Sequence, residues 1–294
     1  MRLEDILKER SMKKSKIIAD VLTYILLSAI AVVILFPVIY SFAASFKPMS
    51  ELFSKADKIL PEHPTFDNYI AIFTSRIIRL GRMLWNSTYY TILCVVITVL
   101  TSTANAYVFE RGNFPFKRTI FLMFSSLMFI SMGSITVYPL FEILNVIHLN
   151  KSLLGLVVIK ALGIPVVNIY LIKSYIHTLP KELDEAAKMD GCSFFAIFIR
   201  IILPLLKPIL VTIMVLSFNA SWNEYLMPAI FTVSDRTQQT LMVGIASLKG
   251  SGEAAANWTV MLAAANISMI PTLILYAFGS KHFVSGLSAG AVKG

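Results

Sequence analysis

The chain has 294 residues, of which 56% are hydrophobic and only 15% are charged. Soluble globular proteins carry about a quarter charged residues, so this composition excludes an ordinary soluble domain and predicts a membrane protein. The net charge of +9 is then explained by the placement of Lys and Arg on one side of a membrane, with no need for a nucleic-acid partner.

Long apolar blocks predict six membrane-spanning helices, since about 20 apolar residues cross the hydrocarbon core. Four blocks hold no charge, and the other two contain Lys160 and the pair Lys207 and Glu224. The first block is longer than the roughly 7–15 apolar residues of a signal peptide, so we expect it to remain as an anchor helix. We therefore expect an all-α membrane protein with spans at about 17–46, 83–109, 119–141, 152–176, 201–228 and 257–280.

The distribution of Lys and Arg predicts the orientation. An even number of spans places both termini on one side, together with the loop 110–118 and the charged region 173–207. That side carries more than half of the 26 basic residues, and such an excess is typical of the cytoplasmic side. We expect a cytoplasmic N-terminal tail at 1–16, a transmembrane domain at 17–282 and a cytoplasmic C-terminal tail at 283–294.

The loop between the fourth and fifth expected spans, LPKELDEAAKMDGCSFFAIFIRIILP (179–204), is unusually charged for its surroundings. Pro180 and the acidic residues that follow it favour the first turn of a helix. Leu183, Ala186 and Ala187 fall on one face at helical spacing, and Gly191 can end the helix. The small residues on that face would allow another surface to approach closely.

The same loop carries a family motif. The chain resembles the inner-membrane permease subunits of ABC importers, whose pattern is EAA, three residues, G, nine residues, I, one residue, LP. The matching residues are Glu185, Ala186, Ala187, Gly191, Ile201, Leu203 and Pro204. The stretches AYVFERGNFPFKR (106–118), WNEYLMP (222–228) and FVSGLSAGAVKG (283–294) are similar to the carbohydrate branch, in particular to the second permease of the maltose system.

This resemblance implies a type I ABC importer permease fold in a bacterial or archaeal cytoplasmic membrane, with a coupling helix at 181–190. It implies a sugar or oligosaccharide cargo moved by alternating access, a second and different permease subunit, two cytoplasmic ATPase subunits and an extracellular substrate-binding protein. ATP and Mg would be bound by the ATPase, with no cofactor on this chain. The residues implied in ATPase coupling are Leu183, Glu185, Ala186, Ala187, Asp190 and Gly191.

The residues themselves agree that the chain is not an enzyme. A phosphate-binding Walker A loop requires Gly directly before Lys, and the sequence contains no Gly-Lys dipeptide. The four histidines are scattered without ligand spacing, which gives a metal site no support. A membrane enzyme would need a reactive cluster at bilayer depth, and a scaffold would leave the charged loop unexplained.

Polar residues near the outer end of the fifth span have two interpretations. Asn219, Trp222, Asn223 and Glu224 either line the translocation pathway, as polar groups at membrane depth often do, or cap the helix, which we favour for Trp222. Because amide groups often bind sugars, Asn219 and Asn223 are the preferred pathway candidates. Lys160 either lines the pathway or extends its stem to the outer interface, which we favour. An ion-gradient-driven transporter is the alternative function, although only Asp20 and Glu224 supply acidic groups near spans.

Overall fold

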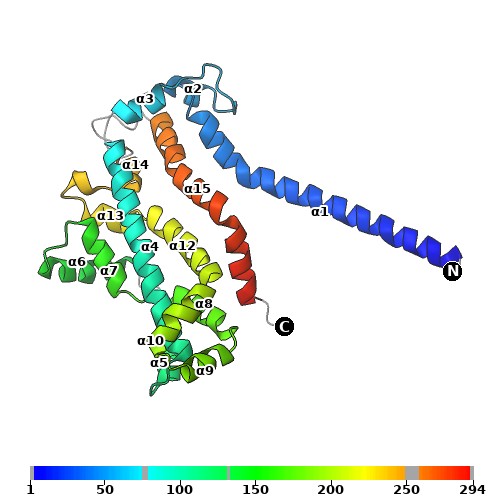
Figure 1. Ribbon diagram of the computed structural model, residues 1–294. Helices are drawn as coiled ribbons and strands as arrows, with labels where there is room; N and C mark the ends of the chain where they lie inside the picture. Colours follow the sequence, from blue (N-terminus) through cyan, green and yellow to red (C-terminus); the bar gives the residue numbers. More distant parts are fainter. Residues whose placement is uncertain (1–2, 75–78, 131–132, 249–257, 292–294) are drawn as a thin grey trace. The chain divides into compact units, whose positions relative to one another are not determined.

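The computed structural model describes residues 3–74, 79–130, 133–248 and 258–291 (Figure 1). All regular secondary structure in these ranges is helical. The chain divides into two compact units, the first extending to Thr74 and including 251–267, and the second covering 75–250 and 268–294. The first unit contains α1 (Leu3–Ala44), α2 (Met49–Ser54), α3 (Asp67–Thr74) and the beginning of α15 (Trp258–Ala291).

The second unit contains the remaining helices and the last part of α15. Its helices are α4 (Leu80–Arg111), α5 (Lys117–Ser126), α6 (Val137–Val146), α7 (Leu153–Leu162), α8 (Val166–His177), α9 (Glu182–Met189), α10 (Phe194–Ile197), α11 (Leu203–Leu205), α12 (Lys207–Trp222), α13 (Leu226–Phe231) and α14 (Leu241–Ser247). Short 3₁₀ turns lie at Leu127–Phe129, Gly133–Thr136 and Arg236–Gln238, and a π-helical turn lies at Phe198–Ile202.

Among the described residues, three helices are long and apolar enough to cross a membrane: Lys16–Ala44, Leu80–Arg111 and Trp258–Gly279. Two bent helix pairs raise the number of candidate spans to five if each pair is one span. In the first pair α7 and α8 meet at 46°, and in the second Phe194–Leu205 meets α12 at 78°. The protein is therefore an all-helical membrane protein with three to five candidate spans.

The span expected at 119–141 is not one continuous helix in the described residues. Instead, α5 ends at Ser126, and α6 begins only at Val137 after two 3₁₀ turns. Gly133 adopts a left-handed backbone conformation with φ of +51°, which cannot continue a right-handed helix. The sequence therefore predicted the apolar block at 119–141, but its hydropathy did not predict the interruption between α5 and α6.

The fifth expected span also differs from the expectation of 201–228. Its helical segment begins earlier, at Phe194, bends sharply near Leu206, and ends at Trp222. Pro204 and Pro208 flank the bend, and each lies in the first turn of its helix, because a proline has no backbone N–H with which to continue the preceding helix. The π-helical turn immediately before Pro204 is a second irregularity of the same segment.

Buried polar contacts organise the first unit. Asn68 donates its amide to the carbonyl oxygens of Ser45, at 2.7 Å, and Lys47, at 2.9 Å. Its Oδ1 accepts a hydrogen bond from Thr259 at 2.9 Å. These bonds join α3 to the segment directly after α1 and to the start of α15.

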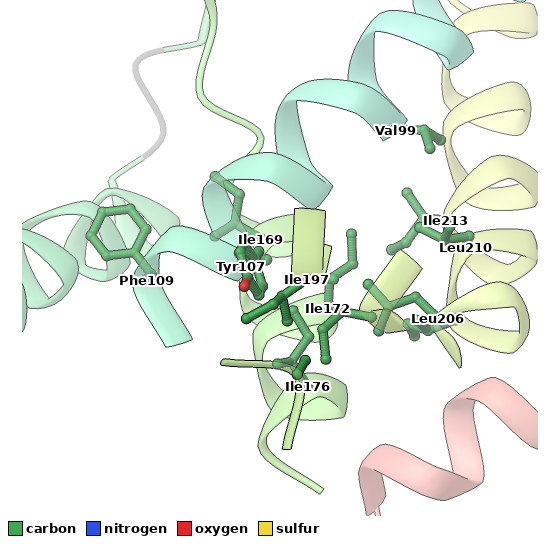
Figure 2. Packing of buried hydrophobic residues seen from close by; sticks show 14 residues of the cluster. Val99, Tyr107, Phe109, Ile169, Ile172, Ile176, Ile197, Leu206, Leu210 and Ile213 are labelled. Atoms are coloured by element: carbon green, nitrogen blue, oxygen red, sulfur yellow. The ribbon is translucent and has the colours of Figure 1, made fainter. Parts of the chain in front are cut away.

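The main hydrophobic core of the second unit lies where α4, α8, α10 and α12 meet (Figure 2). Figure 2 shows Tyr107 of α4, Ile169 of α8 and Ile197 of α10, which all belong to this cluster. Ile172, Ile176, Ile197 and Leu206 are completely buried there. This core holds the charged helix α9, because Ala187 belongs to the same cluster.

Candidate functional sites: the charged helix and the polar cavity

The helix predicted at 181–190 is observed as α9, Glu182–Met189. Acidic residues occupy its first turn, as the helix dipole favours. At its end the N–H of Cys192 bonds to the carbonyl of Ala187 at 2.9 Å, and the N–H of Gly191 bonds to that of Lys188 at 3.0 Å. This is a Schellman motif, and it requires the left-handed conformation of Gly191, whose φ is +77°. Gly191 therefore ends the helix as the sequence predicted.

Only two side chains of α9 are buried, and they lie one turn apart. Asp184 is 6% exposed and Ala187 is 4% exposed, whereas Met189 is 89% exposed. Leu183, Glu185, Ala186 and Asp190 are also exposed. The expectation that Ala187 shares an outward docking face with Ala186 is therefore wrong for Ala187, which packs against the core of its own chain.

A buried ion pair joins α9 to the end of α4. Arg111 Nε lies 2.9 Å from Asp184 Oδ2, and the two side chains are 7% and 9% exposed. The alignment of the two groups is that of an ion pair rather than of a good hydrogen bond. Arg111 Nη2 also donates to the carbonyl oxygens of Leu179, at 2.8 Å, and Ile176, at 3.4 Å. One guanidinium thus connects α4, the C-terminal end of α8 and α9.

Aromatic stacking strengthens the same junction. The ring of Tyr107 lies 4.5 Å from that of Phe194 and 4.9 Å from that of Phe198, measured between centroids. Its hydroxyl donates to the carbonyl of Phe194 at 3.1 Å. The two family motifs at 106–118 and 179–204 therefore meet in space through Tyr107 and Arg111. The sequence identified both motifs, but it gave no sign of this contact.

A second charged group lies beside this junction. Glu110 Oε2 forms an ion pair with Lys173 Nζ at 3.0 Å, and Glu110 Oε1 lies 2.8 Å from His177 Nδ1. Lys117 donates to the carbonyls of Glu110 and Gly112, at 3.0 and 2.8 Å, and so satisfies the C-terminal end of α4. These bonds fix the chain on both sides of Arg111.

A cavity of about 570 Å³ opens among α4, α7, α8 and α12. Its lining is mostly apolar, but Tyr90, Lys160 and Glu224 meet there. Tyr90 donates its hydroxyl to Glu224 Oε2 at 2.8 Å, and Lys160 Nζ lies 3.5 Å from the same oxygen. Lys160 therefore lines the cavity with an acidic partner within reach, while its side chain remains 37% exposed, and its extension to the outer interface stays a prediction.

The four pathway candidates separate in the structure. Glu224 lines the cavity, whereas Trp222 is buried, donates Nε1 to the carbonyl of Ser268 at 2.9 Å and stacks on Phe218. Asn223 donates Nδ2 to the backbone and side-chain oxygens of Asn219, both at 2.9 Å. These two amides are exposed at the end of α12 and do not line the cavity.

The polar head of α4 holds the segment before α14. Asn86 donates to the carbonyls of Thr237 and Gln239, and Ser87 Oγ accepts from the N–H of Leu241 at 2.8 Å. In the same segment Asp235 accepts the N–H and the hydroxyl of Thr237, and these bonds lower the pKa of its carboxyl group. Asn86 and Ser87 therefore act as structural hydrogen-bonding groups between α4 and the segment before α14.

Residues 112–287 match the family described as the binding-protein-dependent transport system inner membrane component. The chain belongs to this family. It is a permease subunit of a binding-protein-dependent ABC importer, an inner-membrane protein and not itself an enzyme. Family membership sets aside the ion-gradient-driven alternative.

Curated relatives cover nearly the whole permease. It is 32% identical to the galactooligosaccharides transport system permease protein GanQ of Bacillus subtilis, over 96% of this chain and 99% of the relative. It is 32% identical to the arabinooligosaccharides transport system permease protein AraQ of Halalkalibacterium halodurans, with the same coverage. The inner membrane ABC transporter permease protein YcjP of Escherichia coli is 31% identical, over 91% and 94% of the two chains.

A solved structure shares the fold of the permease. It is a chain of a bacterial ABC transporter involved in the import of the acidic polysaccharide alginate. The TM-score is 0.76 at 23% identity, over 92% of this chain and 98% of that chain. At this identity the similarity establishes the fold alone.

Proposed function

We propose that this permease moves a sugar or oligosaccharide across the cytoplasmic membrane by alternating access, driven by separate ATPase subunits that dock on α9. The observation that carries the mechanism is the Arg111–Asp184 ion pair, because it joins an exposed charged helix to two helices of the bundle. The sugar cargo is supported by relatives named for galactooligosaccharide and arabinooligosaccharide transport.

The docking surface in this proposal is the exposed part of α9. Leu183 and Ala186 supply apolar contact, Glu185 supplies a polar contact, and Met189 adds an exposed apolar side chain that the motif does not include. Met suits a surface that must adapt to a partner. Asp190 and Gly191 form the capped end of the helix, which fixes its length and direction.

Movement of α9 has a direct route into the bundle. Ala187 is packed in the core, and Asp184 is bound to Arg111, so α9 cannot shift without α4 and the end of α8. α4 and α8 also line the cavity. An ATPase that binds α9 differently with and without nucleotide would therefore bias the bundle between two arrangements.

The complete importer in this proposal contains partners that the sequence resemblance implies. They are a second, different permease subunit, two ATPase subunits that bind ATP and Mg, and an extracellular substrate-binding protein. Both termini lie in the cytoplasm. We place the C-terminal tail near the ATPase in this proposal; its described part, up to Ala291, is helical and belongs to α15.

The docking surface can be tested with Ala186→Arg. A long charged side chain on the exposed face of α9 should abolish co-purification of the ATPase subunits while the permease remains in the membrane. Ala186→Ser, which adds little volume and no charge, is the matched control and should retain the ATPase. Full ATPase retention by Ala186→Arg would exclude this face of α9 as the docking site.

The cargo can be tested in proteoliposomes that contain the complete importer. Labelled galactooligosaccharides and arabinooligosaccharides, presented with the binding protein and ATP, should accumulate inside. Absence of sugar uptake, together with uptake of another class of solute, would refute the sugar assignment.

A further inference from the structure

A second cavity, of about 470 Å³, lies at the N-terminal end of α4. Its walls come from α4, from the beginning of α7 and from the 3₁₀ turn Arg236–Gln238 with the residue before it. It shares no described lining residue with the cavity that contains Lys160 and Glu224. We call it the outer cavity, because this end of α4 faces the extracellular side in the proposed orientation. Among its described lining residues only Leu154 is aliphatic, so the outer cavity suits a hydrated polar ligand.

Two aromatic side chains form a strip along one wall of the outer cavity. Trp85 and Tyr89 lie four residues apart in α4, so their side chains point from the same face of the helix. The helical rise separates them by about 6 Å along the axis, which is close to the length of one sugar ring in a chain. Trp85 is 65% exposed although it lines the cavity, so most of its ring remains available to a ligand. Such a strip can stack on the C–H faces of two consecutive sugar rings.

The opposite wall holds polar groups that the fold keeps in place. Asp235 Oδ1 accepts the N–H and the hydroxyl of Thr237, at 2.9 and 2.6 Å, and its Oδ2 accepts Gln238 Nε2 at 3.1 Å. Gln238 Oε1 accepts the N–H of Leu153 at 3.2 Å. These bonds leave a lone pair on Asp235 Oδ2 and a hydrogen on Gln238 Nε2 for further hydrogen bonds. The wall is therefore a fixed acceptor beside a fixed donor.

Arg82 adds a planar donor at the edge of the aromatic strip. It donates Nε to the carbonyl of Thr237 at 3.3 Å, whereas its two terminal nitrogens make no hydrogen bond within the described part of the chain. The bonds to Thr237 and Gln238 lower the pKa of Asp235, and the charge of Arg82 acts in the same direction. Arg82 and Asp235 are the charged residues of the described lining, so the outer cavity has no net charge. Neighbouring hydroxyl groups can bond to such planar groups in pairs.

We propose that the outer cavity is a site for a neutral oligosaccharide on the extracellular surface of the permease, outside the helix bundle. The proposal rests on the proposed function for the class of ligand. Trp85 and Tyr89 stack on consecutive rings, while Arg82, Asp235 and Gln238 bond to their hydroxyl groups. The aromatic strip and the neutralisation of Arg82 by Asp235 favour a neutral sugar over a carboxylate, such as an acidic side chain of the binding protein.

The first test locates a bound sugar by hydrogen exchange. The complete importer is placed in lipid nanodiscs without the binding protein and without nucleotide, and galactotetraose or arabinotetraose is added. We expect slower exchange of the amides in 235–241 with at least one of these sugars, because the ligand bonds to that wall. Trp85→Ala should weaken binding about 3- to 10-fold, and Trp85→Phe should retain most of the affinity. Tyr138→Ala is the matched control, because Tyr138 is an exposed aromatic residue of α6 that lines neither cavity.

The second test separates a sugar from a side chain of the binding protein. Arg82→Met should weaken binding of the tetrasaccharide about 3- to 10-fold through lost hydrogen bonds. Arg79→Met removes the same charge from the residue before α4, outside the outer cavity, and should bind as the wild type does. Unchanged sugar binding in Arg82→Met, together with weaker attachment of the binding protein, would assign Arg82 to protein docking and overturn the proposal.

The remaining outcomes distinguish this proposal from the proposed function. Normal uptake of oligosaccharides without slower exchange in 235–241 would overturn the outer site and leave the importer function intact. Equal sugar binding by Trp85→Ala and the wild type would reduce Trp85 to an anchor at the membrane interface and would also overturn the site. Failure of uptake for every sugar, with the protection of 235–241 retained, would refute the proposed cargo and leave the sugar site standing.

Discussion

Removal of Arg111 should release α9 from the helix bundle. The Asp184 side chain is only 9% exposed, and in Arg111→Met its carboxylate has no ionic partner. The carbonyl oxygens of Ile176 and Leu179 also lose the hydrogen bonds that Arg111 donates. Removing one member of a buried ion pair costs about 3–5 kcal/mol. Asp184→Asn should cost less, about 1–3 kcal/mol, because Arg111 keeps its two carbonyl partners.

Hydrogen exchange of the amides in 182–192 measures this effect locally, whereas a single unfolding temperature is poorly defined for a complex of several subunits. A loss of about 3 kcal/mol corresponds to at least 100-fold faster exchange through local opening. Lys188→Met is the matched control, because it removes one positive charge from the exposed surface of α9 without touching the pair. We also expect ATP hydrolysis to proceed in Arg111→Met while sugar uptake falls.

The double variant Arg111→Met with Asp184→Leu tests whether the two residues act as a pair. It leaves no uncompensated charge, so its cost should be well below the sum of the two single substitutions. Additive costs would refute the coupling. Equal exchange rates in Arg111→Met and Lys188→Met would refute the buried junction itself.

Three further predictions concern single residues. Gly191→Ala should weaken the end of α9 by about 1–2 kcal/mol, because φ is +77°, and Gly191→Asn should cost less; equal exchange protection of the two variants would contradict this. Trp222→Phe should lower the thermal stability of the permease by about 1 kcal/mol through the lost bond to Ser268, with an unchanged KM for sugar; a raised KM would place Trp222 in the pathway. Because the pKa of Asp235 is lowered in the folded protein, its bonds to Thr237 stabilise the loop at every pH above the ordinary pKa of Asp, and this stability is lost as the pH falls through the folded-state pKa. Hydrogen exchange of the amides in 235–241 should therefore accelerate only below about pH 4. Acceleration near neutral pH would contradict this explanation.

The sequence by itself determined the class of the protein and the existence of α9. Apolar blocks of sufficient length require a membrane, and the acidic first turn with a glycine at the end predicts a short helix between Lys181 and Gly191. The spacing of the motif from Glu185 to Pro204 was enough to suggest the family. These features are local, because each depends on residues close together in the chain.

Only the tertiary structure decided which face of α9 is buried. The helical pattern favours an apolar face with Ala186 and Ala187 together, and it places the charged Asp184 outside. Asp184 is nevertheless buried because Arg111, distant in sequence, neutralises it. A pairing of the same kind, although less buried, occurs at the cavity, where Lys160 of α7 meets Glu224 of the connection between α12 and α13. Burial of a charge depends on its partner, and the partner is brought near only by folding.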